Sequence, residues 1–305
     1  MKIDVDHVLT FWAVASHGSF TKAGVAQNSC QSRVSAKVKA LEERLGTRLF
    51  TRSTRFVELT KSGRLLLSYA NQLAESVSAI ESVADALRRS CEHGLRMGAP
   101  GCTATMPERN ALIDSFSRQQ PEIQLEIEEG LPMALLDRLR RHQIDIALIP
   151  GPLADDGLEL LPVCTLDNML VISENHLLAR LDAIPPARMK GQEVVFAPRE
   201  VHAALYDEIV APLEKLGAVI VTFPEIHTLA RMRYARARGM ITWCQGFEDT
   251  NFAAQGFVLR RVIGVSTQTV LYLVRRKDCG LAHVDALWSS AKRLQNQQRL
   301  SQGVG

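Results

Sequence analysis

The sequence predicts an α/β protein with an all-α helix-turn-helix at its N-terminus, a long linking helix and a C-terminal α/β region. The first observation is a short basic amphipathic helix pattern at residues 29–46, preceded by two other short helical patterns. The second is a heptad pattern over residues 62–90. The third is the alternation of strand and helix patterns from residue 91 onward. Such an alternation is typical of a parallel sheet with helices on both faces.

The helix predicted at residues 29–46 has an apolar stripe, Val34, Val38, Leu41 and Leu45, and ends before a glycine. The rest of its first turns is polar or basic, which for this helix alone is equally typical of a solvated basic face and of a surface that enters a DNA groove. Short hydroxyl and amide side chains reach base edges in the major groove, and cations meet phosphates. The predicted DNA contacts are Thr21, Gln31, Ser32, Arg33, Ser35, Ala36, Lys37 and Lys39.

The neighbours of the basic helix complete a winged helix-turn-helix. An amphipathic helix from Val8 to Ala15 and a second short helix at residues 21–26 precede it, the latter with Ser19 or Thr21 as its N-cap. Downstream, Arg52 and Arg55 flank a turn that leads into a returning strand. A basic hairpin in this place predicts a wing that contacts phosphates or the minor groove.

The matching residues in this region are Phe11, Gly18-Ser19-Phe20-Thr21, Ala23, Gln31, Ser35, Leu41-Glu42, Leu45-Gly46, Leu49-Phe50, Arg52, Leu59-Thr60 and Gly63. With this pattern the first 60 or so residues resemble a LysR-type transcriptional regulator. Gly24 stands where that family usually has a second alanine, which predicts a looser contact with the reading helix.

Charge is distributed unevenly along the chain. Residues 1–61 hold ten Lys and Arg against five Asp and Glu, a net charge of +5, whereas the whole chain has +3. The remainder is therefore slightly acidic. Basic charge lies where DNA binding is predicted, as electrostatic capture of phosphates requires.

The heptad pattern over residues 62–90 predicts a helix of roughly 40 Å at 1.5 Å per residue. A narrow apolar stripe on so long a helix favours a second helix as its partner. The resemblance implies the same, because this position matches the linker helix of a family whose members are commonly tetramers. We therefore expect a homodimer or homotetramer on a pseudo-palindromic DNA site. The predicted dimerisation residues are Leu66, Leu73, Val77, Ile80 and Leu87.

The C-terminal region carries the line PEIQLEIEEG…LLDRLRRHQIDIALI, which resembles the start of the LysR-type effector domain. The resemblance implies a two-lobed fold like that of periplasmic binding proteins, and a small-molecule effector of unknown identity. The predicted domains are residues 1–61 for the winged helix-turn-helix, 62–90 for the linker helix and 91–305 for the effector domain. Within the last, lobe I takes 91–164 and 266–295, with a closing helix at 284–294, and lobe II takes 165–265.

Ligands of two-lobed α/β domains bind in the cleft at the carboxyl ends of strands. By chain order those ends are the loop 99–105, the turn 130–133 and the segments 196–201 and 242–247. Each threonine there could equally be a helix cap. The predicted effector-binding residues are Pro100, Gly101, Cys102, Thr103, Thr105, Gly130, Pro132, Pro198, Arg199, His202 and Trp243.

The six cysteines lie far apart and form no CxxC pair, which favours free thiols in a reducing cytoplasm. A redox-sensing regulator of the same fold remains an alternative, because distant cysteines can meet in a fold. The N-terminus lacks the apolar region of a signal peptide, and no run of about 18 apolar residues predicts a membrane span. The sequence indicates no metal site, no cofactor and no membrane partner.

Enzymatic motifs are missing from the sequence: GxxxxGK[ST], GxGxxG after a strand, HExxH and GxSxG do not occur. The acids Glu42, Glu43, Glu126, Glu128 and Glu129 are interpreted as solvated surface groups. Two alternatives are a solute-binding α/β protein with an incidental helical domain, and a nucleoid-type protein that binds DNA without a ligand. The prediction is a non-enzymatic transcription regulator that binds double-stranded DNA and responds to an effector between its lobes.

Overall fold

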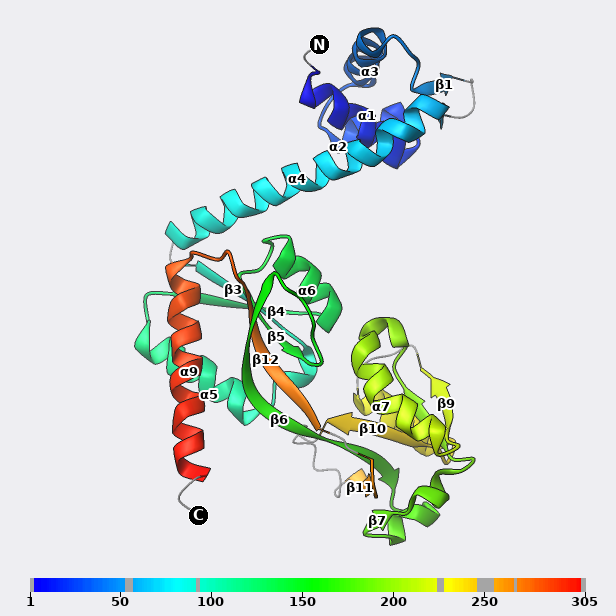
Figure 1. Ribbon diagram of the computed structural model, residues 1–305, viewed down its shortest axis with the longest axis vertical. Coiled ribbons are helices and arrows are strands. Elements are labelled where there is room, and N and C mark those ends of the chain that lie inside the picture. Colours follow the sequence, from blue (N-terminus) through cyan, green and yellow to red (C-terminus); the bar gives the residue numbers. More distant parts are fainter. Residues whose placement is uncertain are drawn as a thin grey trace. The chain divides into compact units, whose positions relative to one another are not determined.

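The computed structural model describes residues 3–52, 57–91, 94–223, 228–245, 255–265 and 268–302. The chain divides into two compact units, Met1–Ala84 and Asp85–Gly305. Among the described helices, none is long and apolar enough to cross a membrane. Figure 1 shows the elements of each unit in the order of the chain.

The first unit is a bundle of short helices beside a two-stranded hairpin. Ser19 is the N-cap of the second helix and accepts from Lys22 N at 3.3 Å, and Gly46 ends the third at φ 67°. Both features confirm the cap offered by Ser19 and the helix end predicted before Gly46, although the second helix begins at Phe20, one residue before its predicted start. The elements are α1 (Val5–His17), α2 (Phe20–Ala26), α3 (Gln31–Leu45), β1 (Phe50–Arg52), β2 (Val57–Leu59) and α4 (Lys61–Cys91).

The core of this unit joins all three short helices to the hairpin. Phe50 of β1 lies against Phe11 of α1 and Phe20 at the start of α2, with ring centroids 5.3 and 5.6 Å apart. The sequence predicted that Glu42 is a solvated group, and this is wrong. Its Oε1 accepts hydrogen bonds from Leu49 N at 2.7 Å and from Phe50 N at 3.2 Å. This carboxylate ties the end of α3 to the first strand of the hairpin.

The turn between α2 and α3 is tight, and the predicted looseness at Gly24 is wrong. Ser29 N donates to Gly24 O at 2.8 Å, and a Cβ on Gly24 would lie 2.8 Å from Ser29 O. The missing side chain therefore allows the turn to approach α2 closely. It brings the two helices together instead of separating them.

Helix α4 begins inside the core of the first unit. Leu66 and Leu73 pack against that core, and Asn71 accepts from Trp12 Nε1 of α1 at 2.8 Å. Farther along, Ile80 and Leu87 are 68% and 55% exposed. The predicted heptad stripe is therefore divided. The side chains of its first half pack on the core of the first unit, and those of its second half are exposed to solvent in the single chain.

In the part of the chain that the structure describes, the second unit is built on one ten-stranded sheet ordered β4-β3-β5-β12-β6-β10-β8-β9, in which β11 also pairs with β6 and β7 pairs with β11. The long strand β6 pairs antiparallel with β12 along its first part and with β10 and β11 along its last part. We call the β4–β12 side lobe I and the β10–β9 side, with β7 and β11, lobe II. The strands are β3 (Gly94–Ala99), β4 (Gln124–Glu129), β5 (Ile146–Pro150), β6 (Leu158–Ser173), β7 (Ala183–Ile184), β8 (Glu193–Phe196), β9 (Val219–Thr222), β10 (Ile241–Gln245), β11 (Phe257–Val262) and β12 (Gln268–Arg276).

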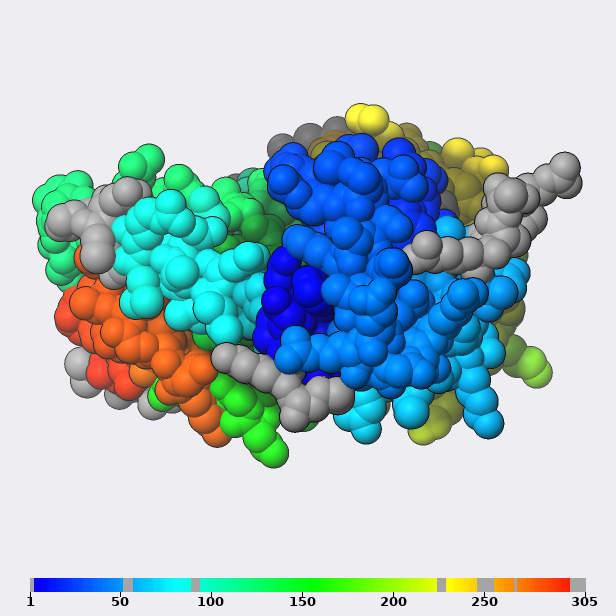
Figure 2. Space-filling model, turned by 90° about the horizontal axis from the view of Figure 1, so that it is seen from above, coloured from blue at the N-terminus to red at the C-terminus, as the bar shows by residue number. Residues whose placement is uncertain are grey.

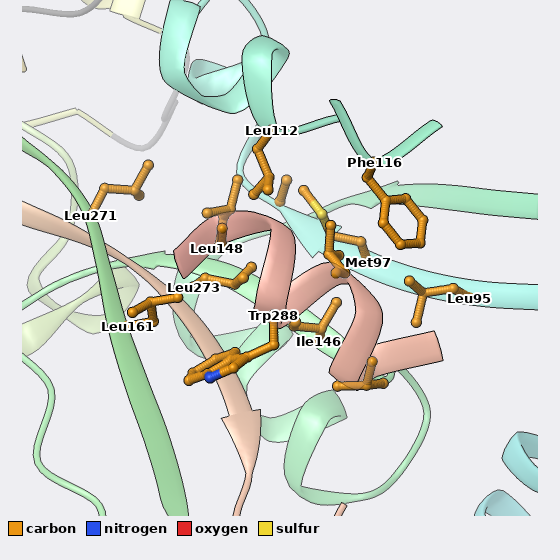
Figure 3. Close-up of a cluster of buried hydrophobic side chains, with 14 of the residues drawn as sticks. Leu95, Met97, Leu112, Phe116, Ile146, Leu148, Leu161, Leu271, Leu273 and Trp288 are labelled. Atoms are coloured by element: carbon orange, nitrogen blue, oxygen red, sulfur yellow. The ribbon is translucent and has the colours of Figure 1, made fainter. Parts of the chain in front are cut away.

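Helices cover the sheet in both lobes. In lobe I, apolar side chains from the sheet, α5 and α9 form one buried cluster that includes Trp288, as Figure 3 shows, and α6 packs on a separate cluster. In lobe II, α7 and α8 pack on two further clusters. The helices are α5 (Pro107–Gln119), α6 (Pro132–Arg140), α7 (Ala203–Lys215), α8 (Thr228–Ala237) and α9 (Ala282–Gln302), with short 3-10 turns η1 (Gly101–Thr103), η2 (Leu177–Arg180), η3 (Pro186–Met189) and η4 (Arg199–Val201).

The closing helix differs from its predicted end. Helix α9 continues to Gln302, whereas the sequence pattern predicted an end at residue 294. The prediction relied on the loss of apolar periodicity, but the added turns hold glutamine and arginine, which are good helix formers and need no core.

Gly63 gives a sharp test of how α4 is anchored. A Cβ there would lie 2.2 Å from Leu49 O, so Gly63→Ala must displace α4 or the hairpin. We expect a loss of about 1–3 kcal/mol in the stability of the first unit, as for other overpacking substitutions. Chemical denaturation measures it, with Gly280→Ala as control because nothing lies within 4 Å of that Cβ. Equal effects of the two substitutions would contradict the close contact.

Candidate functional site

The first candidate site is the exposed face of α3. Val34, Val38 and Leu41 are buried, so the opposite face is turned to solvent. Figure 2 shows the blue segment that contains α3 at the surface of its unit. Of the predicted contacts, the exposed ones are Thr21, Gln31, Ser32, Arg33, Ala36 and Lys39, the half-buried ones are Ser35 and Lys37, the Arg52 side chain is not among those described, and Arg55 lies outside the described residues.

Two lysines of this face form ion pairs with acidic side chains of the same chain. Lys37 Nζ lies 2.7 Å from Asp6 Oδ2 of α1, and Lys39 Nζ lies 3.5 Å from Glu43 Oε1 one turn on. Arg33 is exposed near the start of the helix, where the N-cap residue Cys30 makes no side-chain capping bond. Backbone N–H groups and a cation at a helix N-terminus form a site for a phosphate.

The cysteines do not form a disulfide among the described residues. Burial raises the pKa of Cys164 to about 12 and also raises the pKa of Cys279. A protonated thiol is a poor nucleophile, so these two positions lack the environment of a reactive cysteine. At exposed Cys30 a hydrogen bond with Ser32 lowers the thiol pKa.

The second candidate site is a cavity of about 710 Å³ between lobe I and lobe II, within the range of small-molecule sites. Lobe I contributes the ends of β3, β4 and β5, and lobe II contributes the ends of β8 and β10 with α7 and α8. The predicted residues that line it are Pro100, Gly101, Cys102, Thr105, Gly130, Pro132, Pro198, His202 and Trp243.

Two predicted residues do not line the cavity. Thr103 is buried and its hydroxyl donates to Pro100 O at 2.7 Å, so it fixes the short turn η1. Arg199 is exposed and pairs with Asp207, with Nη2 2.6 Å from Oδ2. Both residues differ from the prediction because their side chains pair with a neighbouring group of their own segment, as loop threonines and surface arginines often do.

Several lining residues were missed by the sequence analysis. Glu129, interpreted as solvated, lines the lobe I wall beside Gly101, while its neighbours Glu126 and Glu128 pair with Arg96. The helix residues among them were not predicted because the prediction was based on the carboxyl ends of strands. The other lining residues are Leu131, Pro150, Phe196, Ala197, Val201, Leu205, Tyr206, Ile209, Leu229, Arg231 and Gln245.

Aromatic rings form much of the lobe II wall. Phe196 stacks on Trp243 with centroids 5.5 Å apart and planes at 20°, and Tyr206 meets Phe196 edge-on at 6.0 Å. Leu205 and Ile209 of α7 continue this apolar surface. The cavity therefore offers a largely apolar wall to a bound molecule.

His202 joins the two lobes at the cavity. Its Nδ1 accepts from Leu205 N at 3.2 Å, capping α7, so the ring proton lies on Nε2, which donates to Pro150 O of lobe I at 2.8 Å. The ring is 5% exposed, and burial lowers the pKa of His202. A neutral ring satisfies both partners, whereas a second proton would remove the cap.

The chain thus combines a helix-turn-helix that has a basic outer face with two α/β lobes around a cavity, an arrangement typical of bacterial regulatory proteins. Two family models match the chain: "Bacterial regulatory helix-turn-helix protein, lysR family" over residues 5–64 and "LysR substrate binding domain" over residues 92–295. The chain belongs to the LysR family and is a LysR-type transcriptional regulator.

Individual relatives agree with this assignment. CzcR of Bacillus cereus is 31% identical over 166 residues, 54% of this chain and 56% of that relative, so the match spans about half of each. MetR of Escherichia coli is 24% identical over 274 residues, 90% of this chain and 84% of MetR. The fold is similar to that of full-length CbnR crystallised with its target DNA, with a TM-score of 0.62 at 17% identity over 95% of this chain and 99% of CbnR.

The alternative of a solute-binding protein with an incidental helical domain is wrong, because the helix-turn-helix itself matches the family's DNA-binding model. Among the described residues, no group of three acid, histidine or cysteine side chains could hold a metal ion.

The His202 contacts predict a pH dependence of stability. The folded-state pKa is lowered, so the unfolded chain takes up a proton first as the pH falls below about 6.5. The contribution of His202 to stability is thus fully present above that pH and is lost progressively as the pH falls below it. Melting temperatures at several pH values should fall more steeply for the wild type than for His202→Gln. Burial also lowers the pKa of His142 and His176, but both remain in the variant, so equal slopes would contradict the role of His202.

Proposed function

We propose that this regulator reads double-stranded DNA with the exposed face of α3 and changes its DNA binding when an effector occupies the cavity between lobe I and lobe II. The observation that carries the proposal is the cavity itself, which has walls from both lobes and an apolar lining with few polar groups. The basic, uncovered face of α3 supports the DNA-reading half.

We also propose that the protein is not an enzyme and that it acts in the cytoplasm, where bacterial DNA is found. The cavity residues support binding better than catalysis. His202 uses both ring nitrogens for structure, and Glu129 lies beside backbone at Gly101. Neither is a general base in contact with a nucleophile among the described lining residues.

We further propose that α4 holds a dimer through the second half of its stripe. Ile80 and Leu87 are large apolar side chains exposed in the single chain, at the heptad spacing that a second helix would fill. Val77 is half-buried beside them. In this proposal Leu66 and Leu73 have a smaller part in the dimer, because they already pack against the chain's own core.

Arg33→Ala tests the DNA-reading face. Binding to the specific site should weaken by about 1–3 kcal/mol if Arg33 contacts a base. Fluorescence anisotropy with specific and random duplexes at several salt concentrations measures the change. A parallel loss on both duplexes, with a salt slope smaller by about one, assigns Arg33 to a phosphate.

Arg44→Ala is the matched control, because Arg44 is exposed on the last turn of the same helix. It should alter binding far less than Arg33→Ala. If the two variants bind alike, or Arg33→Ala binds like the wild type, the first turns of α3 do not form the interface.

Ile80→Glu tests the proposed dimer. The substitution would bury an unpaired charge against the second helix, which is strongly unfavourable. Analytical ultracentrifugation should show dissociation. Ser78→Glu adds the same charge to an exposed position away from the stripe and should leave the assembly intact. An unchanged oligomer for Ile80→Glu would mean that subunits meet elsewhere.

A further inference from the structure

The lobe II wall of the cavity holds three side chains that donate hydrogen bonds. Trp243 and Gln245 lie two residues apart on β10 and so share one side of the strand. Arg231 of α8 lies beside them, and its Nη2 donates to Trp243 O at 3.2 Å. All three line the cavity, although Gln245 and Arg231 are only 6% and 4% exposed.

Two of these donors have no acceptor among the described residues. The indole Nε1 of Trp243 and the amide Nε2 of Gln245 are buried and make no hydrogen bond there. Buried donors are normally satisfied, so each such exception calls for a physical explanation. An isolated case can be a feature of packing, and Trp288 Nε1 in the lobe I core is one. Two at neighbouring positions of one cavity wall, unpaired among the described residues, are available to an acceptor on a ligand.

The charges of the two walls indicate that this acceptor is an anion. Arg231 adds a guanidinium to the donor side, and hydrogen bonds from such a group are strongest to carboxylates and other oxyanions. On the lobe I wall, Glu129 already has a cation near it. Burial lowers the pKa of Arg109, and the negative charge of Glu129 opposes that shift. The negative charge of Glu129 is therefore already compensated by Arg109, and the lobe I wall does not require a positively charged ligand group.

We propose that the ligand is an organic acid with a flat apolar body, whose carboxylate is bound by Gln245, Trp243 and Arg231. The body lies against the stacked rings of Phe196 and Trp243 and the edge of Tyr206. The terminal torsion of the Gln245 amide is broad, so a small rotation presents Nε2 to the cavity. This inference rests on the proposed function, since it takes the cavity as the effector site.

Three ligands of similar shape and different charge test whether the cavity selects a carboxylate. The full-length chain is titrated calorimetrically with 3-phenylpropionate, with the neutral 3-phenylpropionamide and with the zwitterion L-phenylalanine. We expect the acid to bind, the amide to bind at least about tenfold more weakly, and L-phenylalanine no more tightly than the acid. Equal affinities of acid and amide, tighter binding of L-phenylalanine, or no binding of any probe up to about 10 mM would overturn the proposal.

Variants locate the carboxylate. Trp243→Phe keeps a ring for stacking but removes the indole N–H, and Gln245→Leu removes the amide. Each should weaken 3-phenylpropionate binding by about tenfold, the typical size for one charge-assisted hydrogen bond. Trp288→Phe is the matched control, because it removes a buried, unpartnered indole N–H in the lobe I core (Figure 3). Wild-type affinity in both β10 variants, or an equal loss in Trp288→Phe, would overturn the assignment.

DNA binding measured with and without 3-phenylpropionate separates this inference from the proposed function. Acid-selective binding that leaves DNA affinity and footprint unchanged supports the ligand class and overturns the regulatory role of the cavity. A DNA response that is equal for the acid and the amide supports the regulatory role and overturns the ligand class. Melting temperatures of the ligand-free variants confirm that each one folds.

Discussion

The second unit depends on one strand that belongs to both lobes. Along β6 the partner changes from β12 to β10, and at that place Asn168 Nδ2 donates to Thr269 Oγ1 at 2.9 Å. Both side chains are buried, so breaking this pair would leave two polar groups unsatisfied, at about 1–3 kcal/mol each. Gln245 of the cavity wall stands opposite Asn168 in the same ladder. The shared strand therefore sets where the polar wall of the cavity lies.

Across the cavity, the two lobes are joined by a side-chain hydrogen bond instead of a shared strand. The His202–Pro150 hydrogen bond is made by a single side chain and a backbone carbonyl, and the ring that makes it also begins α7. A shared strand resists separation, whereas one neutral hydrogen bond contributes only about 0.5–1.5 kcal/mol. The lobes are thus held firmly at the strand and weakly at the cavity. That combination permits the cavity walls to move relative to each other while the register of β6 is kept.

Sequence patterns predicted the features that depend on local periodicity. The stripe of Val34, Val38 and Leu41, the cap at Ser19 and the strand–helix alternation all follow from side-chain spacing, and the structure shows them. What periodicity could not predict is which groups meet across the fold. Arg231 belongs to α8, which holds three arginines and is followed by a fourth, and only its place against β10 distinguishes Arg231 from the others. Thr103 is not a cavity residue for the same reason, because its buried hydroxyl donates to the carbonyl of Pro100, three residues earlier in the chain.

The proposed coupling between the cavity and DNA requires a choice between arrangements of the lobes, since α3 and the cavity share no residue. A ligand shifts such an equilibrium only by the difference in its binding free energy between the arrangements. Ordinary allosteric coupling is about 1–3 kcal/mol, which is the size of one or two hydrogen bonds to a charged group. Donors that lack partners in one wall can supply this difference if the ligand reaches them in only one arrangement. Helix α4, continuous from Lys61 to Cys91, is then the segment through which the second unit is joined to the first.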